Sequence, residues 1–337
     1  MRASGFLLAA VLCLCSCTQK MVQPSFLQKG DKVAVVAPSC KLADSLLQRA
    51  CLELRAAGLV PVVGSACASE YPACEPELSR GQDPLCFYAG EPPQRAEDLI
   101  RALEDPEIKA VICARGGYGA IQILPLLPKG IWRRNPKWIV GYSDITALHM
   151  ACQKEGVMSL HANMCGELGA LGLREEGNAA MLDFLFGRSS GQYGTAPCRY
   201  NIPGRAQGVL LGGNMITLVS LLGSPYDPLG DRDCILFLEE VSESMHSIDR
   251  LFNMLLLQGK LSRVKGIVFG DFTDCGDEFA MDSAAQMLHR YTSTLDIPVC
   301  FGFPAGHGAL NLPLAEGERV VLEVGEQGAV ISSINAK

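Results

Sequence analysis

The stretch KWIVGYSDITALHM, residues 137–150, joins a strand-like run to a helix-like one. Trp138–Val140 is continuously apolar and leads to Gly141 and Tyr142, and apolar residues at helical spacing follow Asp144. Apolar runs of strand length also stand at 32–37, 59–63, 109–114 and 156–160, with helix-like segments at 43–57 and 92–108. Because apolar strands that alternate with helices are covered on both faces, the pattern predicts a flavodoxin-like α/β domain with a parallel sheet.

The pattern changes after about residue 185. Residues 186–206 are rich in Gly, Ser and Pro, which predicts a linker. Strand-like runs dominate beyond it, at 208–213, 234–240, 265–272, 297–303, 319–324 and 328–334, with helix-like segments at 247–257 and 280–294. A chain of 337 residues, 48% of them apolar, can bury two cores. We therefore predict an N-terminal α/β domain over 29–185 and a smaller β-rich domain over 207–337.

The first residues predict export. MRASGFLLAAVLCLCSC has one positive charge, at Arg2, and an apolar core too short to span a bilayer, which is typical of a signal peptide. Its end, 14–17, resembles a bacterial lipobox, which implies cleavage before Cys17 and lipidation of that residue. An ordinary signal peptide that contains cysteines is the alternative. We favour a lipid-anchored protein of the bacterial cell envelope, on the periplasmic side or the outer membrane, with residues 18–28 as a tether.

The net charge and the cysteine spacing limit which partners and cofactors we expect. The net charge is -7 and there is no basic block, so nucleic acid is not an expected partner. There is no C-x-x-C pair, so we expect no metal site, and no cofactor is implied. Four cysteines within apolar patterns are expected to be small buried side chains: Cys113, Cys152, Cys234 and Cys300. Three in a loop-like region are the disulfide candidates: Cys67, Cys74 and Cys86.

Ser143 and Asp144 follow the carboxyl end of a predicted parallel strand, where sites gather in open α/β sheets. A serine at a sharp strand-to-helix turn projects its hydroxyl from the sheet, as in a nucleophile elbow. The match to G-x-S-x-G is incomplete, because Ile145 replaces the second glycine. The alternative is that Ser143 or Asp144 only caps the helix.

A glycine-rich turn, Gly116–Gly119, follows the strand at 109–114. Glycines here would let the backbone approach a ligand and expose its amides. The segment satisfies neither the G-x-G-x-x-G pattern nor a P-loop, which argues against a nucleotide site. A purely structural tight turn is the alternative.

A serine nucleophile needs a base and a carboxylate that orients it. The five histidines are His149, His161, His246, His289 and His307. His307 stands between two glycines in a loop after an apolar strand, which suits an imidazole that reaches a partner, although a surface-loop histidine is the alternative. Glu239 and Glu240 end another apolar strand, and neighbours on a strand point oppositely, so at most one would face a site. A solvated strand end is the alternative for both.

Together these motifs resemble the LD-carboxypeptidase family of serine peptidases, which includes the microcin C immunity peptidases. The resemblance runs from GDKVAVVAPSC at 30–40 to GHGALNLPLAEG at 306–317. Between them lie ARGGYG at 114–119, GYSDIT at 141–146, GGNMITLVSLLGSP at 212–225 and LFLEE at 236–240. One departure is HAN at 161–163, where HGP or a similar triplet is expected, and a change there could alter specificity.

The resemblance implies that Ser143 is the nucleophile, that His307 is the base and that Glu239 orients it. The amides of Gly117 and Asp144 would form the oxyanion hole, and Arg115 and Gly116 would contact the substrate. It implies a site between the two domains, a homodimer, and a murein tetrapeptide substrate that loses its terminal D-alanine. The rival interpretations are a deacylase of peptide-nucleotide antibiotics on the same triad, a two-lobed binding protein of the envelope and, third, a nucleotide-binding enzyme.

Overall fold

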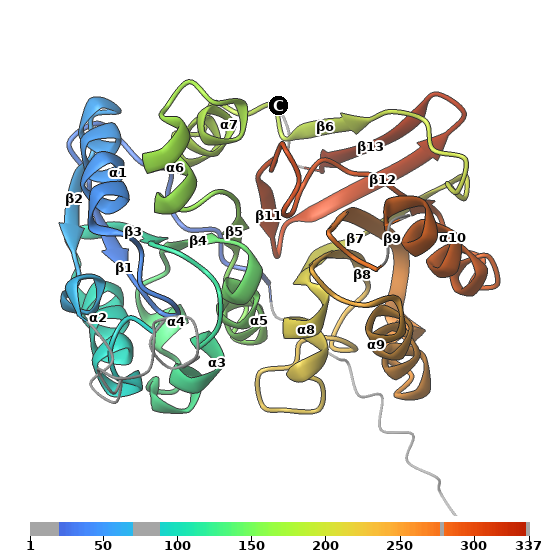
Figure 1. Cartoon of the computed structure of the whole chain (residues 1–337), viewed down its shortest axis with the longest axis horizontal. Helices are drawn as coiled ribbons and strands as arrows, with labels where there is room; N and C mark the ends of the chain where they lie inside the picture. The colour runs from blue at the N-terminus through green and yellow to red at the C-terminus, as the bar shows by residue number, and fades with distance from the viewer. Residues whose placement is uncertain (1–19, 70–87, 277–279, 335–337) are drawn as a thin grey trace, which may run out of the picture.

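Two lobes lie side by side in the computed structural model, each built on one β-sheet (Figure 1). The structure describes residues 20–69, 88–276 and 280–334. Residues 1–19 lie outside this range, so the predicted signal peptide and the lipidation site at Cys17 stay predictions. No helix among the described residues is both long and apolar enough to cross a bilayer.

The N-terminal sheet has six strands in the order β11-β5-β4-β3-β1-β2. Five are mutually parallel: β1 (Lys32–Val36), β2 (Val60–Val63), β3 (Ile108–Cys113), β4 (Trp138–Gly141) and β5 (Ser159–His161). The helices around it are α1 (Asp44–Ala56), α2 (Pro92–Glu104), α3 (Ala120–Ile123), α4 (Ile131–Arg134), α5 (Thr146–Lys154), α6 (Cys165–Leu171) and α7 (Glu176–Leu185). The predicted parallel α/β domain is confirmed.

Both faces of this sheet are buried because successive apolar side chains point to opposite sides. Val33 and Val35 pack with residues of α1, α6 and α7 in one cluster. Ala34 and Val36 pack with residues of α2 and α5 in another. Because helices cover both faces of the sheet, β1 is apolar at every buried position.

The C-terminal sheet is mixed and has seven strands in the order β10-β9-β8-β7-β12-β13-β6. Its parallel part comprises β7 (Gly204–Asn214), β8 (Cys234–Val241), β9 (Val264–Thr273) and β10 (Val299–Cys300). The antiparallel part comprises β6 (Gln192–Thr195), β12 (Arg319–Gly325) and β13 (Gly328–Ser333). Three helices accompany it: α8 (Met215–Ser220), α9 (Met245–Leu257) and α10 (Ala280–Thr292).

The two lobes share one core and one strand. A single apolar cluster joins Leu148 of α5 to Leu218 of α8 and Leu236 of β8. The strand β11 (Leu314–Glu316) belongs by sequence to the C-terminal lobe, yet it pairs antiparallel with β5 of the N-terminal sheet. The strand β11 therefore lies beyond the predicted domain boundary in the sequence but belongs to the N-terminal sheet.

Two predicted connecting segments are more ordered than their composition indicated. The linker over 186–206 contains β6, which pairs with β13 at the edge of the C-terminal sheet. In the tether over 18–28, the described residues from 20 onward run along the N-terminal lobe. Val22 exchanges backbone hydrogen bonds with Gly156 and Met158, and the Trp138 indole donates to Ser25 O at 3.1 Å. Main-chain pairing of this kind does not depend on side-chain pattern.

The cysteines expected in apolar patterns are buried free thiols: Cys113, Cys152, Cys234 and Cys300. Cys67 is also a buried free thiol, so it does not take part in a disulfide as its loop-like sequence had indicated. Cys74 and Cys86 lie outside the described residues.

Close packing of β7 on β8 predicts the cost of a side chain at Gly212. A Cβ atom there would lie 1.8 Å from Phe237 O, so the backbone must shift. We expect Gly212→Ala to lower the free energy of unfolding by about 1–3 kcal/mol, measured by urea denaturation. Gly325→Ala, where a Cβ meets nothing within 4 Å, is the matched control. Equal stability of the two variants would contradict the close packing.

A buried acid at the lobe interface predicts a pH dependence. Glu316 Oε2 accepts hydrogen bonds from Gly212 N at 2.9 Å and Gln153 Nε2 at 2.7 Å, which joins β11, β7 and α5. Burial raises the pKa of Glu316 from 4.5 to about 8. Between these values the folded chain keeps a proton that the unfolded chain has released, so rising pH favours unfolding.

Glu316→Gln keeps this position neutral at every pH. We therefore expect the melting temperature of the variant, relative to wild type, to increase steadily from pH 5 to pH 8. The exposed Glu323, changed to Gln, serves as the control and should give a difference that does not vary with pH. A flat difference for Glu316→Gln would show that its carboxyl is not held neutral.

Candidate active site

Ser143 occupies the sharp turn between β4 and α5. Its φ of +62° lies in the left-handed region, which is uncommon for a residue other than glycine and is frequent at functional turns. A short 3-10 turn, η4 (Ser143–Ile145), leads directly into α5. The strained strand-to-helix turn is the backbone geometry of a nucleophile elbow.

The capping alternative does not account for Ser143. Neither η4 nor α5 has a side-chain cap, and Ser143 Oγ makes no hydrogen bond to any described residue. The Asp144 carboxylate instead accepts from Ser39 Oγ at 2.5 Å and from Ala120 N at 2.8 Å. Asp144 therefore ties the elbow to the loop that follows β1 and to the start of α3.

The glycine turn passes directly over the elbow. A Cβ atom on Gly116 would lie 3.1 Å from Ser143 Cβ, and one on Gly117, whose φ is +104°, would lie 2.5 Å from Cys40 Sγ. Glycine is needed at Gly117 for both its backbone angle and its close approach. The amides of Gly117 and Asp144 donate to no other described residue, so both are available to a ligand.

A buried arginine fixes the same turn. The Arg95 guanidinium is fully buried and donates to Gly119 O at 3.0 Å and to Pro38 O at 2.5 Å. Arg115, at the other end of the turn, is exposed and forms no ion pair with a described residue. Arg95 therefore has a structural role, whereas Arg115 is exposed and no acid in the described ranges neutralises it.

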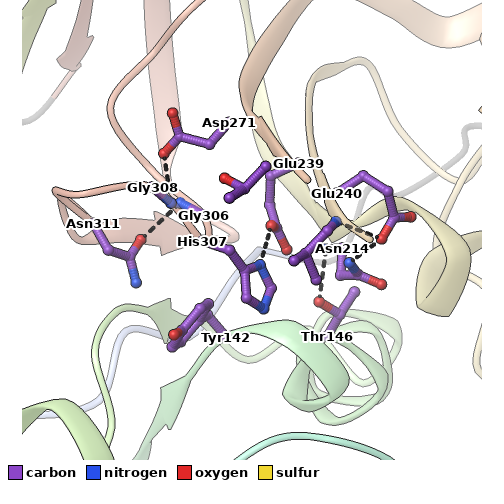
Figure 2. A network of polar contacts seen from close by, with 12 residues as sticks. Tyr142, Thr146, Asn214, Glu239, Glu240, Asp271, Gly306, His307, Gly308 and Asn311 are labelled. Carbon is purple, nitrogen blue, oxygen red and sulfur yellow. Dashed lines mark hydrogen bonds and ion pairs between the residues drawn. The ribbon is translucent and has the colours of Figure 1, made fainter. Parts of the chain in front are cut away.

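The Glu239 carboxylate lies against the His307 imidazole in the second lobe (Figure 2). His307 Nδ1 lies 2.7 Å from Glu239 Oε2, and the Glu239 side chain is 0% exposed. Because a carboxylate at Nδ1 requires a proton there, the neutral ring carries its basic lone pair on Nε2. Burial lowers the pKa of His307, but the hydrogen bond and charge of Glu239 outweigh burial and leave that pKa raised.

The neighbouring acid, Glu240, points away from His307, as alternation along a strand requires. Its carboxylate accepts from Asn214 Nδ2 at 2.7 Å and from Ile216 N at 2.8 Å, and burial raises its pKa to about 7. Asn214 N in turn donates to Thr146 Oγ1, at 2.9 Å, on the helix that follows Ser143 (Figure 2). Neither acid is solvated, and Glu240 helps to hold the two lobes in register.

The loop that carries His307 is held on both sides (Figure 2). Gly308 N donates to Asp271 Oδ2 at 3.1 Å, and Gly306 N donates to Asn311 Oδ1 at 3.0 Å. Burial raises the pKa of Asp271 to about 6. The 18% exposure of the His307 side chain and these contacts exclude the surface-loop alternative.

The HAN triplet lies in a buried network below this loop. Asn311 Oδ1 lies 3.2 Å from His161 Nε2, and Asn311 Nδ2 donates to Asn163 Oδ1 at 3.1 Å. The same Asn311 oxygen accepts from Gly306. HAN therefore supports the histidine loop through Asn311.

Tyr142 connects the two halves of the site. Its ring centroid lies 4.9 Å from that of His307, and its hydroxyl donates to Glu167 Oε1 at 3.0 Å. The structure thus brings Glu239 and His307 together and places them against the residue that precedes Ser143. It contains no hydrogen bond between Ser143 and His307.

The other histidines have different surroundings. His149 is buried, bonded to Ser159 Oγ and Gly141 O, and burial lowers its pKa to about 4. His289 lies 2.9 Å from Tyr200 O, and His246 is exposed on α9. Among the described residues no cluster of three or more His, Cys, Asp or Glu could hold a metal ion.

Sequence reasoning missed the residues that support the site. Tyr142 and Asn311 stand inside the motifs GYSDIT and GHGALNL, so their positions were visible but their roles were not. Asp271 and Asn214 follow apolar strand runs as polar residues, the same signal that had singled out Glu239. Their contacts join distant segments, which spacing along the chain does not reveal.

Comparison with known proteins agrees with this geometry. Residues 33–162 match the LD-carboxypeptidase N-terminal domain and residues 207–322 match the LD-carboxypeptidase C-terminal domain. A probable murein peptide carboxypeptidase of Bacillus subtilis is 32% identical, over 92% of this chain and 94% of its own length. A murein tetrapeptide carboxypeptidase of Pseudomonas aeruginosa is 29% identical, over 87% and 93% respectively.

A solved structure agrees with the fold as well. An MccF-like protein from Bacillus anthracis superposes with a TM-score of 0.79 at 26% identity, over 93% of this chain and 99% of the other. A two-lobed fold with a serine elbow facing a Glu–His pair is that of a serine peptidase. The chain belongs to the LD-carboxypeptidase family, as its motifs had indicated.

The Glu239–His307 pair predicts a measurable change in a titration. We expect Glu239→Gln to lower the pKa of His307, because burial then acts without the neighbouring charge. Proton NMR of the imidazole signals measures this, with His289 as the internal control. An unchanged His307 titration would contradict the pairing.

The same pairing makes the stability of the fold depend on pH. Because the pKa of His307 is raised above 6.5, the pairing stabilises the fold below pH 6.5, and this stabilisation is lost as pH rises through the folded pKa.

Proposed function

We propose that this protein removes the terminal D-alanine from murein tetrapeptides by cleaving the L,D-peptide bond that follows diaminopimelate or lysine. The observation that carries the proposal is the buried Glu239–His307 pair, packed against the serine elbow in a chain of this family. The names of the Bacillus and Pseudomonas relatives support a murein peptide as the substrate class.

The proposed chemistry is acyl transfer to Ser143. His307 Nε2 takes the hydroxyl proton as Oγ attacks the peptide carbonyl, and then gives it to the departing D-alanine amine. Water, activated by the same nitrogen, attacks the acyl-enzyme, releases the tripeptide and restores the serine proton. Glu239 holds the ring orientation and stabilises the imidazolium that forms in each step.

The arrangement is complete when Ser143 Oγ and His307 Nε2 come within hydrogen-bonding distance. Catalytic hydrogen bonds are often long in the free enzyme and tighten when substrate binds, which fits the Ser143 hydroxyl that has no partner here. The amides of Gly117 and Asp144 are the proposed oxyanion donors. Loss of one such donor typically costs roughly 3–4 kcal/mol of barrier. Arg115 is the proposed partner of the substrate carboxylate, since no described acid neutralises it.

We also propose that the protein is located in the bacterial cell envelope. A lipid on Cys17 would place the enzyme on the periplasmic side or at the outer membrane, where muropeptides occur. A homodimer is the proposed assembly, implied by the family.

A second substrate class is worth testing because one structural relative is MccF-like. A deacylase of peptide-nucleotide antibiotics would use the same serine, histidine and glutamate on a different acyl group. An acyl-sulfamoyl adenylate is the matching probe.

Ser143→Ala gives the decisive experiment. We expect it to lower D-alanine release from a murein tetrapeptide by about 10⁶, because the remaining rate comes only from binding and the oxyanion donors. Mass spectrometry of the tripeptide product measures the loss. Glu239→Gln should lower turnover by about 10⁴ through lost orientation of the histidine.

The exposed serine on α8, changed in Ser220→Ala, is the control and should keep full activity. An activated phosphonate should label the wild type and Ser220→Ala but not Ser143→Ala. Retained activity in a folded Ser143→Ala protein would exclude the serine mechanism. Wild-type cleavage of the adenylate but not of the tetrapeptide would move the function to the second class. Absence of both cleavage and labelling would favour a binding protein.

A further inference from the structure

A large cavity lies away from the serine elbow. It has a volume of about 980 Å³ and is bounded by Lys20–Gln23, by the N-terminal lobe and by β7 and β12 of the C-terminal lobe. Neither Ser143, Glu239 nor His307 lines it.

The strand directions place this cavity at the opposite edge from the chemistry. Its lining includes Asp233 and Arg263, which stand directly before β8 and β9, and Met158, which stands directly before β5. Glu239 and Ser143 stand at the carboxyl ends of β8 and β4. A strand of eight residues, the length of β8, spans roughly 25 Å. The cavity is therefore a separate site at the amino ends of the parallel strands.

The cavity is positively charged in a chain whose net charge is -7. Five basic residues line it: Lys20, Arg133, Arg232, Arg263 and Arg319. The lining has two acids, and both are engaged. Asp233 pairs with Arg263 at 2.9 Å, and Glu318 accepts from a serine hydroxyl while burial raises its pKa.

Two of the arginines form no ion pair with any acid in the described part of the chain. Neither Arg232 nor Arg319 lies within ion-pairing distance of a described carboxylate. Arg232 is half-buried, and its guanidinium contacts the sulfur of Met21. The charge of Asp231 acts on Arg232, but Asp231 forms its ion pair with Lys154. A partly desolvated guanidinium that is not in direct contact with a carboxylate favours a bound anion, and its planar fork suits phosphate.

The rest of the lining consists of four apolar residues, two glutamines and two glycines. Met21, Val22, Met158 and Val209 contribute to the wall beside the arginines. A ligand that fits this surface carries an anionic group together with an apolar portion. Met21 and Val22 are partly exposed, whereas Met158 and Val209 are buried. Arginines next to partly exposed apolar side chains are also what proteins present to a lipid interface.

The N-terminal segment at the rim of the cavity indicates which ligand of this kind is bound. Lys20, at its rim, follows the predicted lipidation site Cys17 by three residues, a reach of at most about 10 Å. We propose that this cavity binds the phosphate of an anionic phospholipid and rests on the membrane surface, with the catalytic edge turned toward the periplasm. The inference uses the predicted anchor but does not depend on the proposed reaction.

Vesicle binding by the unlipidated full chain, Cys17→Ser, tests this proposal. We expect stronger sedimentation with vesicles of phosphatidylcholine and phosphatidylglycerol than with phosphatidylcholine alone, and the preference should weaken as salt rises. The leader, which carries Arg2, is the same in every protein, so a difference in this ratio between variants reports the substituted arginines. Arg232→Gln with Arg319→Gln should reduce the ratio by roughly 25-fold, about fivefold for each cation.

Arg101→Gln with Arg188→Gln is the matched control, since it removes the same charge from two exposed arginines outside the cavity. This control should keep the preference, and tetrapeptide cleavage in solution should be unchanged in both double variants. Loss of the preference in the cavity variant alone supports the proposal. Equal preference in all proteins would overturn it, as would binding of inorganic phosphate or soluble glycerol phosphate without any vesicle preference. A change of oligomeric state in the cavity variant without a change of vesicle ratio would reassign the surface to a protein contact.

Discussion

A carboxylate buried at the end of β8 sets the position of the histidine loop. Glu239 is fully inaccessible, and one of its oxygens, Oε1, has no hydrogen-bond partner among the described residues. Burial of a charge is costly unless it is paired and hydrogen-bonded. The imidazole of His307 provides that pairing, so the loop from Gly306 to Asn311 must close over Glu239. The same contact that compensates the acid also fixes the ring orientation that acid–base chemistry needs.

That pair is useful only if the two lobes keep their register, because the serine elbow belongs to the other sheet. Several contacts of different kinds hold the two lobes in this register. The core is shared, β11 crosses into the N-terminal sheet, and Glu316 bonds to both β7 and α5. The Asn214–Thr146 hydrogen bond lies closest to the elbow. Since these contacts are largely buried, a large hinge motion would expose both the shared core and the paired acids. Adjustments of loops and side chains are the cheaper way to bring Ser143 and His307 together.

Much of this arrangement could be predicted from the sequence, since apolar runs mark the long buried strands and the GYSDIT stretch marks the elbow. The short strands could not. β11 has three residues, Leu-Ala-Glu, and β6 reads Gln-Tyr-Gly-Thr, so neither shows the pattern of a strand. Both form because a neighbouring strand offers unpaired main-chain groups. Asn311 and Asp271 escaped notice for a related reason, since their partners are 5 to 150 residues away in the chain.

The parallel topology also explains why the molecule has two chemically different edges. Parallel strands gather their carboxyl ends at one edge, where the turn after β4 carries Ser143 and the last residues of β8 include Glu239. Their amino ends gather at the other edge, where Arg263 and Asp233 precede β9 and β8. Residues at that second edge are not constrained by the chemistry, so their charge can vary without cost to turnover. An accumulation of arginines there, of which Arg232 and Arg319 have no ion-pair partner among the described residues, therefore favours an anionic partner. The N-terminal segment, at Lys20–Gln23, lies at that same edge. A membrane anchor on this segment would therefore hold the amino-end edge against the membrane.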